Sequence, residues 1–155
     1  IRAVKSVKYP PLGNRGVGLA RAQNYGFGFD EYVEKINSRT MVIVQIEHID
    51  AINNLEEILS TKGVDGSIIG PYDLSGSMGK PGKYNEPDVK KALEKYERLA
   101  KDIGKPFGYH VIEPDYKLVL EKIDLGYTII AFSLDTLFLG SICRNQMDRI
   151  KEHFN

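Results

Sequence analysis

The sequence predicts an α/β fold in which parallel β-strands alternate with α-helices. Four short apolar runs rich in β-branched residues are spread along the chain, which is typical of strands buried on both faces of a parallel sheet. Each run is followed by apolar residues at helical spacing. No apolar stretch approaches the roughly 18 residues that a membrane-spanning helix needs. A layered sheet-and-helix domain is therefore expected.

The first elements follow directly from this pattern. Residues 2–7 resemble the end of a helix, which must stop before Pro10 and Pro11. Residues 41–47 form the first predicted strand, and Asp50 is the expected N-cap of the next helix. The apolar positions of that helix recur at helical spacing: Ala51, Ile52, Leu55, Ile58 and Leu59.

The second strand is expected at residues 63–70, and a long helix follows it. Asn85 and Asp88 match a capping box, Pro87 lies in the first turn, and Gly104 ends the helix. The apolar stripe of this helix consists of Val89, Ala92, Leu93, Tyr96, Leu99, Ala100 and Ile103.

The last third of the chain repeats the same alternation. Strands are expected at residues 105–112 and 127–135, with a helix at residues 114–125 between them. Asp135 is the expected N-cap of a final helix over residues 136–154. Cys143 is expected on the apolar, core-facing side of that helix.

Two architectures fit four parallel strands in 155 residues. One is an open doubly wound sheet, and the other is part of a TIM (β/α)₈ barrel, which usually needs about 250 residues. Because the chain starts within an element, it would be the C-terminal half of such a barrel, strands 5–8. We expect residues 1–155 to form a single domain, a partial barrel lacking its N-terminal half. In both architectures the functional residues lie at the carboxyl ends of the strands.

Charge and cysteine content exclude several classes of protein. The chain has 21 basic and 21 acidic residues, and it has no basic run of the kind that binds nucleic acid. The single cysteine, Cys143, cannot form an internal disulfide. No signal peptide is visible. A reducing, cytoplasmic location with no nucleic-acid or membrane partner is expected.

Two carboxylates stand at the ends of consecutive predicted strands, Glu47 and Asp73. Adjacent strands lie about 4.8 Å apart, so both carboxylates can bind one divalent cation. Mg²⁺ and Mn²⁺ prefer oxygen ligands, and two protein ligands leave room for water and substrate. The alternative is that each acid is an ordinary surface or capping residue.

Other candidate residues are weaker. His110 ends the third strand on the functional edge, although a hydrogen-bonded packing role fits its position slightly better. Gly16 and Gly18 resemble part of a dinucleotide-binding motif, but no strand precedes them, so a tight loop is expected. No Ser/His/Asp order or nucleophile elbow is visible.

Three segments in this order, YPPLGNRGVG, VQIE and GVDGSIIGPYDLSGSMG, closely resemble the HpcH/HpaI family of class II pyruvate aldolases. The family includes 2,4-dihydroxyhept-2-ene-1,7-dioate and 2-dehydro-3-deoxyglucarate aldolases. The resemblance implies a (β/α)₈ barrel, a homo-oligomer that is usually a hexamer, and a divalent metal (Mg²⁺, Mn²⁺ or Co²⁺). It matches Glu47 and Asp73 to the metal ligands and Gln45 to the pyruvate site. It also matches Gly70 and Tyr72 to positions whose backbone amides face the pyruvate carboxylate.

The implied reaction is cleavage of a 4-hydroxy-2-oxo (2-keto-3-deoxy) acid into pyruvate and an aldehyde. The histidine base and the arginine of the family belong to the half that this chain lacks. The chain departs from the family at His48, Tyr72 and His110, where Thr, a small residue and an apolar residue are more common. Two alternatives are a non-catalytic half-barrel that binds metal or a 2-oxo acid, and a barrel enzyme of the citrate-lyase-β or phosphoenolpyruvate type.

Overall fold

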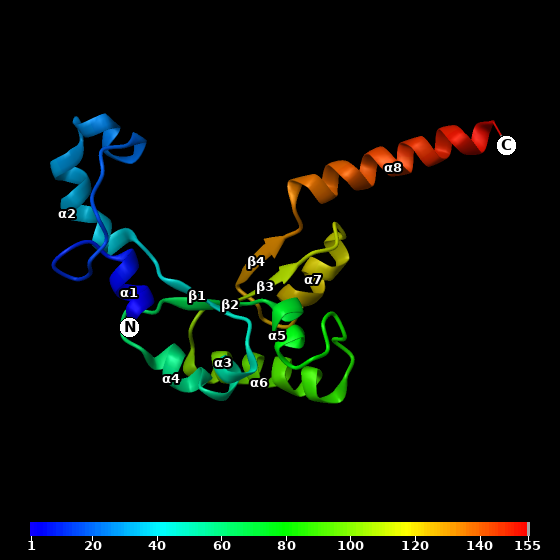
Figure 1. Ribbon diagram of the computed structural model, residues 1–155, viewed down its shortest axis with the longest axis horizontal. Helices are drawn as coiled ribbons and strands as arrows, with labels where there is room; N and C mark the ends of the chain where they lie inside the picture. The colour runs from blue at the N-terminus through cyan, green and yellow to red at the C-terminus, as the bar shows by residue number, and fades with distance from the viewer. Residues whose placement is uncertain (155) are drawn as a thin grey trace.

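The structure, a computed structural model, describes residues 1–154 and contains one parallel sheet (Figure 1). Within these residues the sheet has four strands in the order β1-β2-β3-β4. The strands are β1 (Ile43–Ile46), β2 (Gly66–Ile69), β3 (Phe107–Val111) and β4 (Ile129–Phe132). Every neighbouring pair is parallel. The predicted α/β fold is confirmed, with strands somewhat shorter than expected.

Helices connect the strands and flank the sheet. They are α1 (Arg2–Val7), η1 (Arg21–Gly26), α2 (Phe29–Arg39), α3 (Ile49–Asn53), α4 (Leu55–Ser60), α5 (Pro71–Ser77), α6 (Pro87–Ile103), α7 (Tyr116–Asp124) and α8 (Asp135–His153). Residues 12–19, which include Gly16 and Gly18, form a loop, as predicted. No helix among the described residues is both long and apolar enough to cross a membrane.

The core lies between one face of the sheet and helices α3, α4 and α6 (Figure 1). Ile46 and Ile69 project from the strands into this layer, where they are almost completely buried together with Leu55, Leu59 and Tyr96. The apolar stripe predicted from the sequence of α6 is confirmed, because Val89, Ala92, Tyr96 and Ala100 are its buried residues.

The opposite face of the sheet is open, so the expectation of strands buried on both faces is wrong for this chain. Ile43 is 37% exposed, Gln45 on the same face of β1 is also exposed, and Ile68, its partner in β2, is only half-buried. Residues alternate between the two faces of a strand. The apolar side chains on the open face therefore have no layer above them in the described structure.

Helix starts differ from the predictions by one or two residues. The cap of α3 is His48, whose Nδ1 accepts a hydrogen bond from the Asp50 amide at 3.1 Å. Asp50 lies in the first turn, where a negative charge is also favourable. Asn54 interrupts the single helix that was expected, so that α3 and α4 are separate.

The predicted capping box of α6 is not formed. The N-cap is Glu86, and the Asp88 carboxylate is bound to Lys80 at 2.7 Å, which draws it away from a capping interaction with Asn85. Gly104 ends the helix as predicted, in the left-handed conformation with φ 73°. Asp135 is the first residue of α8, one position after its N-cap Leu134.

Helix α8 projects from the body of the chain (Figure 1) and has no buried residue. Cys143 is exposed, so the expectation that it lies in the core is wrong. Cys143 does lie on an apolar side of α8, but no other element of the described residues packs against that side. At the other end of the chain, η1 and α2 also stand away from the sheet.

Candidate functional site

The predicted site residues meet where β1 and β2 end. Ile46 pairs with Ile69 in the sheet, which places the next residues, Glu47 and Gly70, side by side. A Cβ atom added to Gly70 would lie 3.2 Å from the Cβ of Glu47 and 3.5 Å from the Nε2 of Gln45. A side chain at this position would press against Glu47, so glycine gives Glu47 and Gln45 more room.

A cavity of about 300 Å³ opens on the uncovered face of the sheet at this edge. Five residues singled out in the sequence line it: Gln45, Gly70, Tyr72, Asp73 and His110. The remaining lining is mainly apolar and comes from Ile68, Ile69, Pro71 and Ile112. An apolar pocket with a few convergent polar groups is typical of a small-molecule site.

A second cavity of about 540 Å³ adjoins the first. Its lining is Glu47, His48, Tyr72, Asp73, Gly76 and Ser77, so Tyr72 and Asp73 line both cavities. The two predicted metal-binding carboxylates, Glu47 and Asp73, therefore face one common space. The tertiary structure brings them together from two different strand ends.

These two carboxylates fit a hard divalent cation that keeps several water or substrate ligands. Both side chains are exposed, and their oxygens are the ligand type that Mg²⁺ and Mn²⁺ prefer. Among residues 1–154, no three His, Cys, Asp or Glu side chains lie close enough to enclose a metal ion. The arrangement therefore resembles an open site rather than a closed structural one.

The backbone amides near Gly70 differ in availability. The Gly70 amide donates to the Ile46 carbonyl at 2.9 Å and so belongs to the sheet. Pro71 has no amide hydrogen, and Tyr72 follows it in the first turn of α5. Because the first amides of a helix have no acceptor within it, the Tyr72 amide can bind an anion.

His110 lines the smaller cavity from β3 and is half-buried. Its Nε2 lies 3.4 Å from the carbonyl oxygen of Ser133. A carbonyl only accepts hydrogen bonds, so this contact favours the tautomer with the proton on Nε2.

Comparison with known proteins identifies the family. The sequence matches the HpcH/HpaI aldolase/citrate lyase family over residues 1–139. The chain belongs to this family. The 2-keto-3-deoxy-L-rhamnonate aldolase of Escherichia coli K12 is 33% identical, with 99% of this chain and 57% of that protein covered.

Two solved structures of HpcH/HpaI proteins resemble the chain closely. An HpcH/HpaI aldolase/citrate lyase family protein from Burkholderia cenocepacia has a TM-score of 0.85 and 29% identity, covering 96% of this chain and 58% of that protein. An HpcH/HpaI aldolase from Desulfitobacterium hafniense has a TM-score of 0.80 and 31% identity, and the match covers 96% of this chain and 57% of that protein. This HpcH/HpaI chain therefore spans a little more than half the length of the relatives that it matches.

Two serines of α5 hold the site together in this HpcH/HpaI chain, and sequence reasoning missed both. The Ser77 Oγ accepts a hydrogen bond from the Ile49 amide at 3.0 Å, which ties α5 to the segment after Glu47. The Ser75 Oγ donates to the Tyr72 carbonyl at 2.7 Å and accepts from the Gly82 amide at 2.9 Å. Only the run of small residues around them in the sequence hinted at close packing.

Tyr84 was also missed, because it lies in the loop between α5 and α6. Burial raises the pKa of the Tyr84 hydroxyl, and the negative charges of Glu113 and Asp73 contribute in the same direction. A tyrosine in a loop has no sequence pattern that would reveal this.

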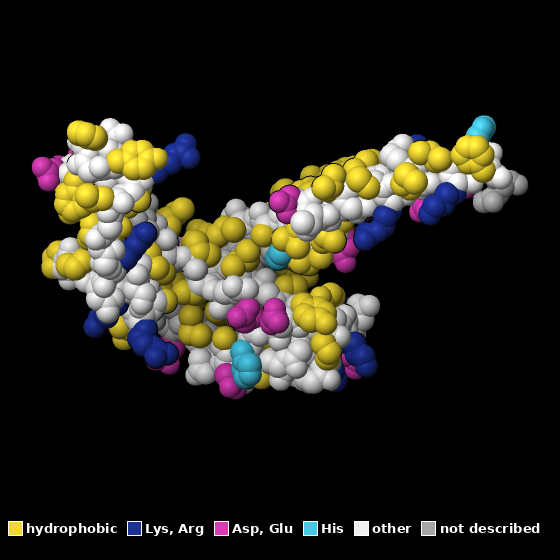
Figure 2. Space-filling model, turned by 45° about the horizontal axis from the view of Figure 1, so that its top comes forward, with side chains coloured by type: hydrophobic (Ala, Val, Ile, Leu, Met, Phe, Trp, Pro, Cys, Tyr) yellow, Lys and Arg dark blue, Asp and Glu magenta, His cyan; other side chains and the backbone are white. Residues whose placement is uncertain are grey.

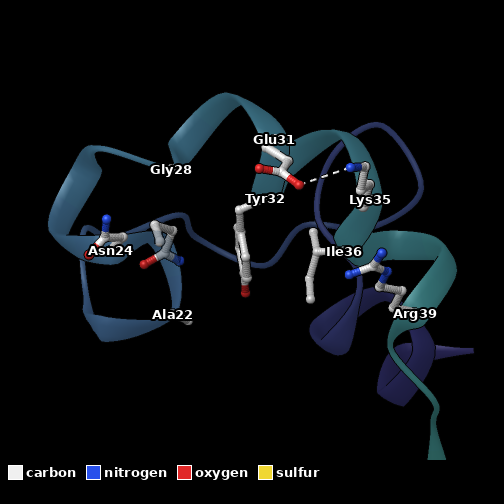
Figure 3. A pocket seen from close by; sticks show the side chains of 9 residues that line it. Ala22, Asn24, Gly28, Glu31, Tyr32, Lys35, Ile36 and Arg39 are labelled. Carbon is white, nitrogen blue, oxygen red and sulfur yellow. Dashed lines mark hydrogen bonds and ion pairs between the residues drawn. The ribbon is translucent and has the colours of Figure 1, made fainter.

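The HpcH/HpaI chain has another cavity, of about 430 Å³, between η1 and α2 (Figure 3). It contains none of the predicted site residues. Two of its charged side chains, Glu31 and Lys35, bind each other at 2.9 Å, and this ion pair lowers the pKa of Glu31. Since the cavity lies away from the strand ends, it is a poor candidate for the chemistry of a parallel-sheet enzyme.

Proposed function

We propose that this protein is a metal-dependent lyase that cleaves a 4-hydroxy-2-oxo acid into pyruvate and an aldehyde by a retro-aldol reaction. The observation that carries the proposal is the meeting of Glu47 and Asp73 at one cavity beside Gly70. Membership of the HpcH/HpaI family supports a carbon–carbon lyase. The relative from Escherichia coli is named for cleaving a 2-keto-3-deoxy sugar acid, which belongs to the same substrate class.

Each site residue has a role in this proposal. Glu47 and Asp73 hold a divalent cation such as Mg²⁺, Mn²⁺ or Co²⁺, which when bound supplies positive charge that stabilises an enolate of pyruvate. Gln45 donates from its amide to the 2-oxo acid, and the Tyr72 backbone amide binds the carboxylate. Gly70 provides the bare backbone that lets the substrate approach.

Proton transfer needs groups beyond these. His110 is the candidate within this chain, because it lines the same cavity as Gln45 and Asp73. The histidine base and the arginine that the family resemblance implies would come from the preceding half of the protein. Four further strands would then join β1 and β4, the edge strands of the described sheet, and close a barrel.

The direct test is pyruvate release by the full-length gene product from a set of 4-hydroxy-2-oxo acids. Activity is expected with Mg²⁺ or Mn²⁺, and EDTA is expected to abolish it until the metal is restored. Pyruvate release that EDTA does not affect would contradict the metal-dependent mechanism. Absence of release from every acid of this class would favour a non-catalytic binding module.

Substitution of the two carboxylates tests their role separately. Glu47→Gln and Asp73→Asn should each lower kcat/KM at least about a hundredfold, because several kcal/mol of charge stabilisation are lost. Both should also weaken Mn²⁺ binding measured by electron paramagnetic resonance. Glu57→Gln and Asp102→Asn, at exposed positions on α4 and α6, are matched controls that should retain activity and Mn²⁺ binding. Wild-type Mn²⁺ affinity in both site variants would overturn the assignment.

A further inference from the structure

Tyr72 is an unusual side chain for its position in the site. It is 58% exposed, although it follows the buried Pro71 and precedes Asp73 at the edge of two cavities. It lines the smaller cavity beside Gln45 and Gly70, and it also lines the larger cavity beside Glu47. Tyr72 thus borders both spaces.

The loop between α5 and α6 supports this ring. A Cβ atom on Gly82 would lie 3.5 Å from the Tyr72 Cε2, so the ring lies against the bare backbone of the loop. Gly82 has φ +73°, a conformation that favours glycine. The loop is held by the Gly82 amide donating to the buried Ser75 Oγ and by the Lys80 amide donating to the Ser75 carbonyl at 2.8 Å.

The chemistry of the proposed substrate puts its variable end next to this ring. If the Tyr72 amide and Gln45 hold the 2-oxo-acid end, the carbons beyond the cleaved bond must extend from the cavity of about 300 Å³ toward the larger one. Tyr72 provides both the backbone amide that would bind the substrate carboxylate and the aromatic ring. A chain leaving the smaller cavity therefore passes the Tyr72 side chain.

We propose that Tyr72, supported by the loop of Gly82, determines the size of the aldehyde that the site accepts. The inference rests on the proposed aldolase function and adds a specificity-determining residue to it. The ring restricts the passage between the two cavities, so short aldehydes fit and long ones are disfavoured. Removing the ring joins the two spaces and admits longer chains.

The test uses the full-length protein in the aldol direction, with pyruvate and either acetaldehyde or butanal. The measured quantity is the ratio of kcat/KM for butanal to that for acetaldehyde. Tyr72→Ala should raise this ratio about tenfold, since a few methylene groups in a pocket change discrimination by roughly that factor or more. Tyr72→Phe keeps the ring and should keep the wild-type ratio.

Two further variants separate specificity from stability. Ser75→Ala removes the hydroxyl that holds Gly82 and should raise the ratio by a smaller factor than Tyr72→Ala. Tyr116→Ala removes a similarly exposed tyrosine, 63% exposed, from α7 and should leave the ratio unchanged. A general loss of folding lowers both kcat/KM values together and the melting temperature, but it does not change their ratio.

The outcomes distinguish this inference from the function on which it rests. An active, EDTA-sensitive enzyme whose ratio stays within twofold in Tyr72→Ala overturns the role of Tyr72 and leaves the aldolase function intact. A raised ratio in Tyr72→Phe as well would show that the hydroxyl group, and not ring size, sets the preference. A wild-type protein without EDTA-sensitive aldolase activity would overturn both proposals.

Discussion

At the scale of single residues, buried hydroxyl groups fix the sheet against its main helix. The Tyr96 hydroxyl lies 2.9 Å from the Ser67 Oγ, and the Gly108 amide donates to the same hydroxyl at 3.3 Å. Tyr96 and Ser67 are fully buried. A buried polar group left without a partner costs more than a hydrogen bond gains. One hydroxyl therefore links α6 to both β2 and β3.

Removal of this hydroxyl should weaken the fold measurably. Tyr96→Phe leaves the buried Ser67 hydroxyl without its partner, so we expect a loss of about 1 to 3 kcal/mol in the free energy of unfolding. Tyr116→Phe, at an exposed position, should change it by less than about 0.5 kcal/mol. Urea denaturation of the two variants gives the comparison. Equal midpoints for both would show that the buried contact contributes nothing.

At the scale of elements, a cluster of aromatic rings joins β3, β4 and α6. The ring centroids of Phe107 and Tyr127 are 4.7 Å apart, and those of Tyr109 and Tyr127 are 5.5 Å apart. The Tyr127 hydroxyl donates to Glu97 at 2.8 Å. Burial raises the pKa of Tyr109 to about 12. Burial also raises the pKa of Tyr127, and the negative charge of Glu97 is the second cause of that shift.

These raised pKa values predict a loss of stability at alkaline pH. Below about pH 10 both tyrosines are protonated in the folded and unfolded chains. Above it the unfolded chain releases protons that the folded chain retains, so the free energy of unfolding should fall between about pH 10 and 12. Denaturation at several pH values measures the slope, and Tyr109→Phe should reduce it. An unchanged slope in Tyr109→Phe would contradict the contribution of this residue.

At the scale of the whole molecule, the projecting helix α8 presents an apolar stripe on which no other element of residues 1–154 packs. Figure 2 shows apolar side chains along the projecting helix. The stripe consists of Leu139, Cys143, Met147, Ile150 and Phe154, which recur every three or four residues, and every one of them is exposed. Exposed stripes of this kind are typical of surfaces that bind another protein. The homo-oligomer that the family resemblance implies would cover this stripe with a second copy of the protein.

Charge placed in this stripe should change the assembly. Full-length protein should have a mass in solution of more than one chain, and Leu139→Glu combined with Ile150→Glu should reduce it to that of one chain. The pair Arg144→Glu and Arg149→Glu, on the same helix outside the stripe, is the control. Light scattering coupled to size exclusion measures the masses. An unchanged mass in the Leu139 and Ile150 variant would place the interface elsewhere.

Much of the fold could be read from local patterns. The parallel strands, the stripe of α6 and its end at Gly104 follow from residue spacing and from the backbone freedom of glycine, which act within a few neighbouring residues. Helix starts were less predictable, because several polar side chains near each start compete for the same contacts. Lys80 draws Asp88 away from the start of α6, and His48 replaces Asp50 as the cap of α3.

The sequence by itself determined the α/β class, the family and the residues that stand at the strand ends. Tertiary structure alone decided that Glu47 and Asp73 face one cavity, since that depends on the register of β1 with β2. It also decided that Gly82 and Ser75 support Tyr72, and that Cys143 is exposed rather than buried. The physical reason is that spacing along the chain records which side of an element is apolar, whereas its packing partner depends on contacts between distant segments.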